Sequence, residues 1–183
     1  CNRGKRSIAL DLKSDQGMSI LRSLVERADI VQHNMRYDAA IRLGVDYDSL
    51  RELKPDLIYC HTRGFEKGER AGLPGNDQTG AALAGSEWMD GGLDDDGNPV
   101  WSVTSLGDVG NGFLSAIGMV QALYHRDRTG KGQFLDTSIV YAQLLNNSMA
   151  WVSPDGSRTS GRPSLDKMQT GWHALYALYE TAD

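Results

Sequence analysis

Apolar residues recur at two spacings near the start of the chain, and these spacings predict alternating strands and helices. From 15 to 28 they recur every three or four positions behind Ser14 and Asp15, either of which can cap a helix. Strand-like apolar runs lie on either side, at 7–12 and 29–34. A strand, an amphipathic helix and a strand within about 30 residues form a βαβ unit, which implies a parallel sheet.

The alternation continues through the next hundred residues and predicts an α/β fold, a Rossmann-like domain with a parallel sheet flanked by helices. The sequence predicts helices at 37–43, 47–53, 78–90 (ended by Gly91-Gly92), 109–125 and from 141, and a strand at 57–65. It predicts a strand or a strand–helix junction at 134–140, and loops or turns at 66–75, 94–99 and 125–133. Proline and glycine in a polar background predict a linker at 153–171, before a new apolar segment at 172–183.

Composition and charge narrow the classes of protein to consider. With 40% hydrophobic and 23% charged residues, the chain has enough apolar material for a core and enough charge for a soluble surface. A net charge of −5 argues against a nucleic-acid binder, and no apolar run is long enough to span a membrane. Two cysteines, Cys1 and Cys60, cannot form a disulfide framework and fit a reducing cytoplasm. We therefore expect a cytoplasmic protein.

One carboxylate, Asp108, lies among Gly107, Gly110 and Gly112 directly before an apolar helix. It can be read as a helix cap or as a nucleophile that a substrate approaches closely. Glycine in a helix costs about 1 kcal/mol relative to alanine, so the three glycines predict a close approach by a ligand or by another backbone. A helix N-terminus also favours a negative intermediate. The residues alone leave both readings open.

The sequence shows no second motif that carries chemistry. The glycines match neither the P-loop nor the dinucleotide-binding pattern, and no serine lies in a nucleophile elbow. The histidines at 33, 61, 125 and 173 lack metal-ligand spacing, so we expect no metal site.

Several segments, taken in order, resemble the family III CoA-transferases, which include formyl-CoA transferase, carnitine CoA-transferase and α-methylacyl-CoA racemase. NRGKRSIALDLK at 2–13 is similar to their NRNKRSIALDLK strand. Residues 28–65 are similar to their ADV…N-F-x-P-G…LG…LIY…GF block, and 107–140 to their GD…G…TG-x-GQ-x-x-D-x-S segment. The ordered set covers nearly all of residues 2–150.

The resemblance implies that Asp108 is a nucleophile. In the transferases this aspartate attacks the thioester of an acyl-CoA, and the mixed anhydride becomes an aspartyl-CoA thioester from which a free carboxylic acid takes the CoA. Glycine neighbours give the thioester access to the carboxylate, and backbone N–H groups can hold the oxyanion. Coenzyme A, as an acyl-CoA, is then a substrate.

The resemblance also implies, by position, a set of coenzyme A contacts. They are Leu10, Lys13, Asn34, Met35, Arg42 and Leu43. The charges of Lys13 and Arg42 suit the ADP phosphates, and the alternative for each is a solvated surface charge. For Leu10 and Leu43, core packing is an equal alternative, and Met35 departs from the family's phenylalanine.

The racemases carry a histidine and an aspartate in a GHD segment, where this chain has Gly75, Asn76 and Asp77. An amide cannot exchange protons near neutral pH as imidazole does. We therefore expect a transferase, with a 2-methylacyl-CoA racemase or a non-catalytic CoA-binding fragment as the alternatives.

The family fold implies a division of the chain and a larger parent. Residues 1–152 correspond to most of the large Rossmann-like domain, 153–171 to a linker and 172–183 to the start of a small domain. The chain begins without methionine and ends within a pattern, so we expect a fragment that is inactive alone. The expected parent is an interlocked homodimer whose other partners are acyl-CoA and carboxylic acids, with neither nucleic acid nor membrane.

Overall fold

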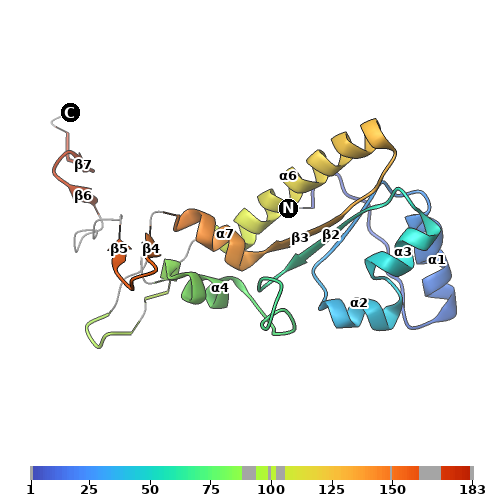
Figure 1. Cartoon of the computed structure of the whole chain (residues 1–183), viewed down its shortest axis with the longest axis horizontal. Coiled ribbons are helices and arrows are strands. Elements are labelled where there is room, and N and C mark those ends of the chain that lie inside the picture. Colours follow the sequence, from blue (N-terminus) through green and yellow to red (C-terminus); the bar gives the residue numbers. More distant parts are fainter. Residues whose placement is uncertain are drawn as a thin grey trace.

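The computed structural model describes residues 2–87, 94–98, 100–101, 106–148, 150–160 and 170–181 (Figure 1). In chain order the elements are α1 (Asp15–Val25), β1 (Ile30–His33), α2 (Tyr37–Leu43), α3 (Tyr47–Leu53), β2 (Ile58–Arg63), α4 (Asp77–Ala84), α6 (Leu106–Thr129), β3 (Phe134–Ser138), α7 (Ile139–Asn146), β4 (Ala150–Val152), β5 (Arg158–Ser160), β6 (Gly171–His173) and β7 (Tyr176–Ala177).

The central sheet has the strand order β1-β2-β3, and both pairs are parallel. Ile30 lies opposite Ile58, and Tyr59 lies opposite Phe134. Helices α2 and α3 connect β1 to β2, and α6 precedes β3. The predicted α/β class and the parallel sheet are therefore confirmed.

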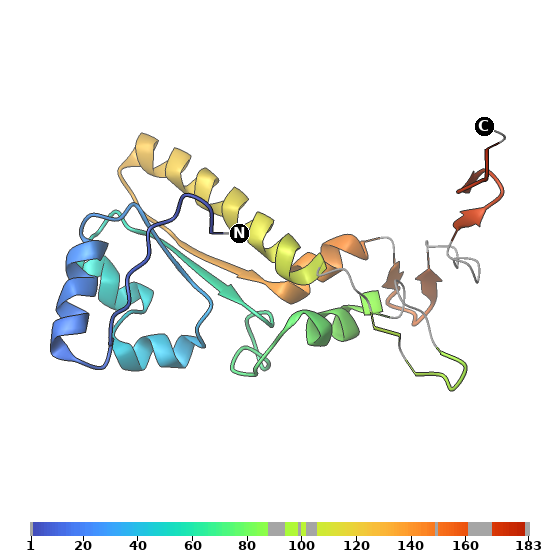
Figure 2. The same ribbon diagram turned by 180° about the vertical axis from the view of Figure 1, so that it is seen from behind.

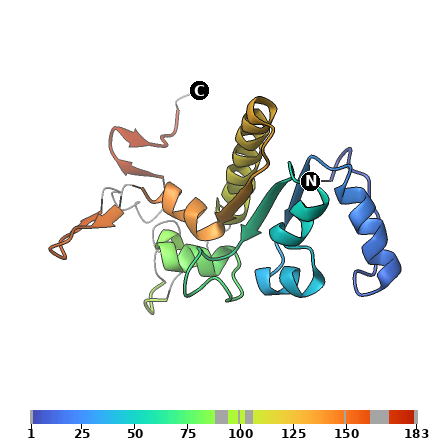
Figure 3. The same cartoon turned by 45° about the vertical axis from the view of Figure 1, so that its right-hand side comes forward.

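Successive side chains of β2 point to opposite faces of this sheet, because side chains alternate along a strand with a period of two residues. Tyr59 packs in a buried cluster beneath α1, α2 and α3. On the other face, Thr62 lies 3.2 Å from the Ser115 hydroxyl of α6, oxygen to oxygen. Helices thus cover both faces, which explains why consecutive residues of β2, from Ile58 to His61, are all buried (Figure 3).

The N-terminal segment 7–12, predicted to be a strand, has no regular structure. It reaches α1 as an extended trace without entering the sheet (Figure 2). A strand needs a neighbour to satisfy its backbone groups, and no described strand lies beside this one. Ile8 is accordingly 61% exposed. The sequence pattern for a strand was correct in composition but could not supply the pairing partner.

The helix ends differ from their predicted positions for local reasons. Helix α1 begins as predicted, with the Ser14 hydroxyl accepting from the Gly17 N–H at 3.0 Å, but it ends at Val25. Helix α4 ends at Ala84 because Gly85 adopts a left-handed conformation with φ of 81°. The predicted stop at Gly91-Gly92 lies outside the described residues. Helix α6 extends beyond 109–125 at both ends.

In the loop that connects β2 to α4, Gly64 and Gly75 bring the two ends of the loop into contact. A Cβ added to Gly64 would lie 2.5 Å from the Gly75 Cα, so neither position has space for a side chain. Residues 67–70 between them are exposed. The segment 66–75 is the loop that the sequence predicts, and its two ends are in contact.

After α7 the described chain forms two antiparallel hairpins, β4–β5 and β6–β7. Strand β5 lies within the predicted linker 153–171, of which 161–169 lies outside the described residues. The division into large domain, linker and small domain stays a prediction. Among the described helices, none combines the length and the apolar character needed to cross a membrane.

Candidate active site

Asp108 lies in the first turn of α6, at the edge of the sheet where the strands end. Because β3 follows α6 and runs back along it, the start of the helix lies near the carboxyl end of β3. No hydrogen bond or ion pair joins the Asp108 carboxylate to another described residue, and Asp108 is exposed. Asp108 belongs to the first turn of α6 and does not precede the helix, as an N-cap residue would. This position disfavours the simple cap.

The electrostatics of this position favour the neutral carboxyl. The pKa of the Asp108 carboxyl is raised above its usual value. Partial burial is the larger cause, and the negative charge of Asp77 is the smaller one. The amide groups at a helix N-terminus act in the opposite sense, since they favour negative charge. A carboxylate with a raised pKa is a stronger base, and hence a better nucleophile, than one held by hydrogen bonds.

Asp77 forms a buried network that connects α4, α6 and α7. Its Oδ1 accepts from the Gly107 N–H at 2.9 Å and from the Gln143 side-chain amide at 2.9 Å. The Ser86 hydroxyl in turn donates to Gln143 Oε1 at 2.6 Å. All three side chains are at most 5% exposed. The network fixes the backbone that carries Asp108, because it binds the residue directly before it.

The glycines around Asp108 have different surroundings. A Cβ on Gly107 would lie 2.3 Å from Asp77 Oδ1 and 2.6 Å from Ile139 Cγ2, and one on Gly110 would lie 3.0 Å from the Ala142 Cβ. A Cβ on Gly112 would meet no atom within 4 Å. At Gly107 the close approach is made by protein side chains, rather than by the ligand or backbone that the sequence predicts, and Gly110 is tight. Gly112 is left without a packing reason.

Asn76 is an exposed helix cap. Its side chain accepts from the Thr79 N–H at 2.9 Å, and the Thr79 hydroxyl accepts from the Asn76 N–H at 2.9 Å. This reciprocal pair is a capping box at the start of α4. The residue that stands in place of the racemase histidine thus has a structural role that an amide fulfils.

The six predicted coenzyme A contacts lie in three places. Leu10 and Lys13 lie in the segment before α1, Asn34 and Met35 in the turn after β1, and Arg42 and Leu43 in the last turn of α2. Lys13, Asn34 and Arg42 are exposed, and the other three are half-buried. Met35 and Leu43 pack against the core cluster, which supports the packing alternative for Leu43. No described hydrogen bond or ion pair joins any of the six side chains to Asp108, and their roles stay predictions.

Sequence reasoning missed Gln143 and Ser86. Gln143 lies 66 residues from Asp77 and Ser86 lies 57 residues from Gln143, so no local spacing connects them. Their only signal is that each is a polar residue in an otherwise small or apolar helical segment. In the part of the chain that the structure describes, no three His, Cys, Asp or Glu residues are grouped as metal ligands.

The family model for CoA-transferase family III matches residues 1–183. The chain belongs to CoA-transferase family III. The resemblance predicted from the sequence is therefore confirmed over the whole chain. The family III chain thus places an exposed aspartate at a glycine-rich helix start.

Relatives of this family III chain have more than one named activity. It is 36% identical to succinate–glutarate CoA-transferase of Agrobacterium fabrum over 90% of its length and 40% of the relative. It is 34% identical to human α-methylacyl-CoA racemase over 99% of its length and 47% of the relative. A crystal structure of a CaiB/BaiF family protein from Brucella suis matches 81% of the chain and 40% of that structure, with 35% identity and a TM-score of 0.73. The chain thus spans less than half the length of these relatives.

Proposed function

We propose that the protein transfers coenzyme A from an acyl-CoA to a free carboxylic acid, with Asp108 as the nucleophile. The observation that carries the proposal is an exposed carboxylate, free of described hydrogen bonds, in the first turn of α6. Relatives named as CoA-transferases support this reaction class.

The reaction requires four exchanges at carbonyl carbon. An Asp108 oxygen attacks the thioester carbonyl, the C–S bond breaks, and CoA leaves as a thiolate. The thiolate then attacks the aspartyl carbonyl of the anhydride, which forms the aspartyl-CoA thioester and releases the donor carboxylate. The acceptor carboxylate attacks the aspartyl-CoA thioester, the C–S bond breaks, and a second mixed anhydride and CoA thiolate are formed. The thiolate then attacks the acceptor carbonyl of this anhydride, which releases the acceptor as its CoA thioester and regenerates the Asp108 carboxylate.

The first turn of α6 suits this chemistry in two ways. Its backbone N–H groups favour the oxyanion that develops in each exchange. Gly112 lies one turn after Asp108 on the same helix face, and side chains on a helix lean towards its N-terminus. A side chain at 112 would lean over the carboxylate, so its absence leaves room for a thioester. This gives Gly112 the functional reason that packing does not provide.

Coenzyme A binding is proposed for Leu10, Lys13, Asn34, Met35, Arg42 and Leu43. The exposure of Lys13 and Arg42 suits contacts to the ADP phosphates. The turn at Asn34 and Met35 follows the carboxyl end of β1, and ligands of open parallel sheets bind at the carboxyl ends of the strands. The site is thus expected along that edge of the sheet, in a homodimeric parent.

The alternative function is the racemisation of a 2-methylacyl-CoA, which the named activity of the human relative favours. That reaction needs a group that removes and returns the α-proton. Asn76 is an amide and is engaged in the capping box of α4. Incorporation of solvent deuterium at the α-carbon separates the two functions, because the transferase exchanges bonds only at the carbonyl carbon.

Trapping of the covalent intermediate tests the proposal. The complete natural protein that contains these residues is incubated with a panel of acyl-CoAs, quenched with hydroxylamine and mapped by mass spectrometry. We expect a hydroxamate on Asp108 with at least one acyl-CoA and none in Asp108→Asn, a matched variant without a nucleophilic carboxylate. Absence of modification with every acyl-CoA, in a protein that exchanges the α-proton, would refute the transferase in favour of the racemase. Absence of both activities would leave a CoA-binding remnant.

A further inference from the structure

Two histidines from neighbouring strands hold the backbone of one residue, Met35. His33 Nδ1 accepts from the Met35 N–H at 3.1 Å, and His61 Nε2 lies 2.9 Å from the Met35 carbonyl oxygen. His33 is the last residue of β1, and His61 lies directly opposite it in β2. The rings stack with centroids 4.9 Å apart. One peptide segment is thus held by both its N–H and its C=O.

The partners of His33 fix its tautomer. The Tyr59 hydroxyl donates to the Val45 carbonyl at 2.8 Å, so the same oxygen accepts from His33 Nε2–H. Nδ1 therefore carries the lone pair that receives the Met35 N–H. Burial, together with the neighbouring His61, lowers the pKa of His33 to about 4, so the ring stays neutral at neutral pH.

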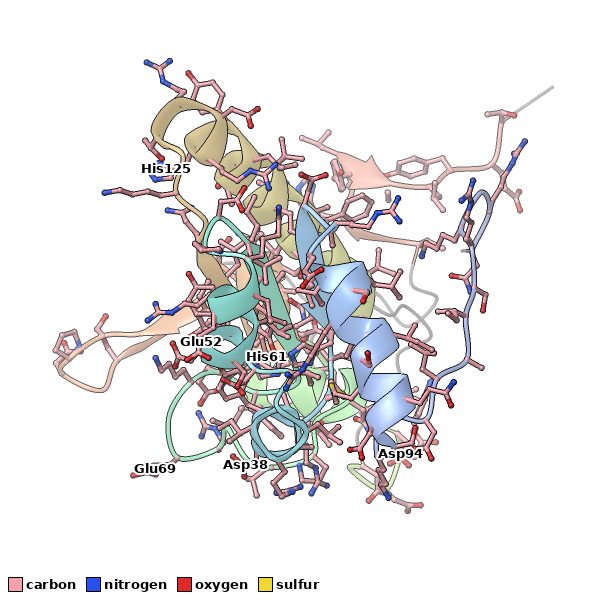
Figure 4. The ribbon with its side chains drawn as sticks, turned by 90° about the vertical axis from the view of Figure 1, so that its right-hand side faces the viewer. Asp38, Glu52, His61, Glu69, Asp94 and His125 are labelled. Carbon is pink, nitrogen blue, oxygen red and sulfur yellow. The ribbon has the colours of Figure 1, made fainter. Side chains whose placement is uncertain are left out.

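The partners of His61 fix its tautomer in the same way. The Arg63 guanidinium donates to His61 Nδ1 at 3.0 Å, so Nε2 carries the proton that is donated to the Met35 carbonyl. Arg63 itself lies 2.8 Å from the Asp136 carboxylate of β3. His61 is 2% exposed and lies inside the molecule, whereas His125 lies at its periphery (Figure 4). All three strands thus contribute to the position of Met35.

We propose that His33 and His61 are positioning residues, which hold the Asn34–Met35 turn in the conformation that binds coenzyme A. The inference rests on the proposed function, which places this turn at the CoA site. Because the N–H and C=O of Met35 are both hydrogen-bonded, its backbone is held in place, while Asn34 beside it is exposed. A turn that is already ordered loses less conformational freedom on binding, so the clamp strengthens affinity without touching the ligand.

Asparagine and glutamine provide a crossed test in the complete protein. The Asn amide reaches the place of Nδ1, and the longer Gln amide reaches the place of Nε2. At position 33 the clamp needs an acceptor at Nδ1, so His33→Asn keeps it and His33→Gln loses it. At position 61 it needs a donor at Nε2, so His61→Gln keeps it and His61→Asn loses it. Each amide is therefore the matched control for the other.

Two readouts separate the clamp from the reaction. We expect His33→Gln and His61→Asn to speed hydrogen exchange at the Met35 amide and to raise the KM for acyl-CoA about tenfold, the loss of roughly one hydrogen bond, with kcat within about twofold. His33→Asn and His61→Gln should stay within about threefold of the natural protein in KM. Exchange at the buried Tyr59 amide should be equal in all four, as a control for folding.

The outcomes that overturn the inference are specific. Equal exchange at Met35 in both members of each pair refutes the clamp, whether or not the protein transfers CoA. A crossed pattern in exchange with unchanged KM refutes its role in CoA binding. If the natural protein neither binds nor transfers CoA, the proposed function fails, and the exchange data still decide whether the clamp exists.

Discussion

Gly107→Ala is expected to destabilise the protein, although alanine is the better helix former. The added Cβ would lie 2.3 Å from Asp77 Oδ1, 2.6 Å from Ile139 Cγ2 and 2.7 Å from Gln143 Nε2. None of these atoms can withdraw easily, because Asp77 and Gln143 are hydrogen-bonded to each other and buried. The carboxylate that receives the Gly107 N–H would have to move.

The magnitude follows from two opposing effects. Overpacking in a buried site costs about 1–3 kcal/mol, and disruption of a hydrogen bond to a buried charge adds a further 1.5–3 kcal/mol or so. The gain in helix propensity from glycine to alanine returns only about 1 kcal/mol. The net expectation is a loss of about 1.5–5 kcal/mol in the free energy of unfolding.

The same helix provides the control. Gly112→Ala meets no atom within 4 Å, so it should gain about 0.5–1 kcal/mol from propensity alone. If Gly112 leaves room for the thioester, this more stable variant should nevertheless load acyl groups more slowly. Urea denaturation followed by circular dichroism measures both stabilities. If Gly107→Ala is as stable as Gly112→Ala, the packing argument is refuted.

Two further predictions concern protonation. Asp77→Asn keeps an oxygen acceptor for the Gly107 N–H but removes a charge that raises the pKa of Asp108. The acid limb of the pH profile of acyl loading should therefore move to lower pH, and an unmoved limb would contradict this coupling. The pKa of His33 is about 4 in the folded protein and 6.5 in the unfolded chain. Its contribution to the free energy of unfolding is therefore complete above pH 6.5 and is lost as the pH falls towards 4. This loss of stability should be about 2 kcal/mol after discounting for partial solvent exposure. Urea denaturation at several pH values measures it, and the loss should be absent in His33→Asn.

The parts of the fold that depend on local signals could be predicted from the sequence. Helices α2 and α3 have their predicted bounds, because Gly44 ends α2 in a left-handed conformation and the Asp46 side chain caps α3. Ser14 likewise caps α1 as predicted. These signals lie within a few residues of the structure that they specify.

The parts that depend on distant partners could not be predicted. Segment 7–12 has the composition of a strand, but none of the strands that the structure describes lies beside it, and no local pattern reveals this. Asp77 was singled out as part of a motif, but its network with Gln143 depends on three helices meeting. The spacing of His33 and His61 in the sequence shows only that they lack a metal-ligand pattern, because the register of β1 and β2 is what brings their rings together. Asp108 itself was found from its glycine neighbours, of which Gly107 proves to serve packing.

The contact between Gly64 and Gly75 separates the length of a loop from the geometry of the site. Because the backbones of Gly64 and Gly75 are in contact, the ends of the loop are fixed. The start of α4 is therefore positioned independently of how many residues lie between these two glycines. Lengthening a closed loop costs little, since the entropy of closure grows only slowly with length. The exposed residues 67–70 are therefore where evolution can insert a lid or a recognition element, and where an engineer can place a fluorescent label. Neither change would alter the hydrogen bonds that hold the start of α6.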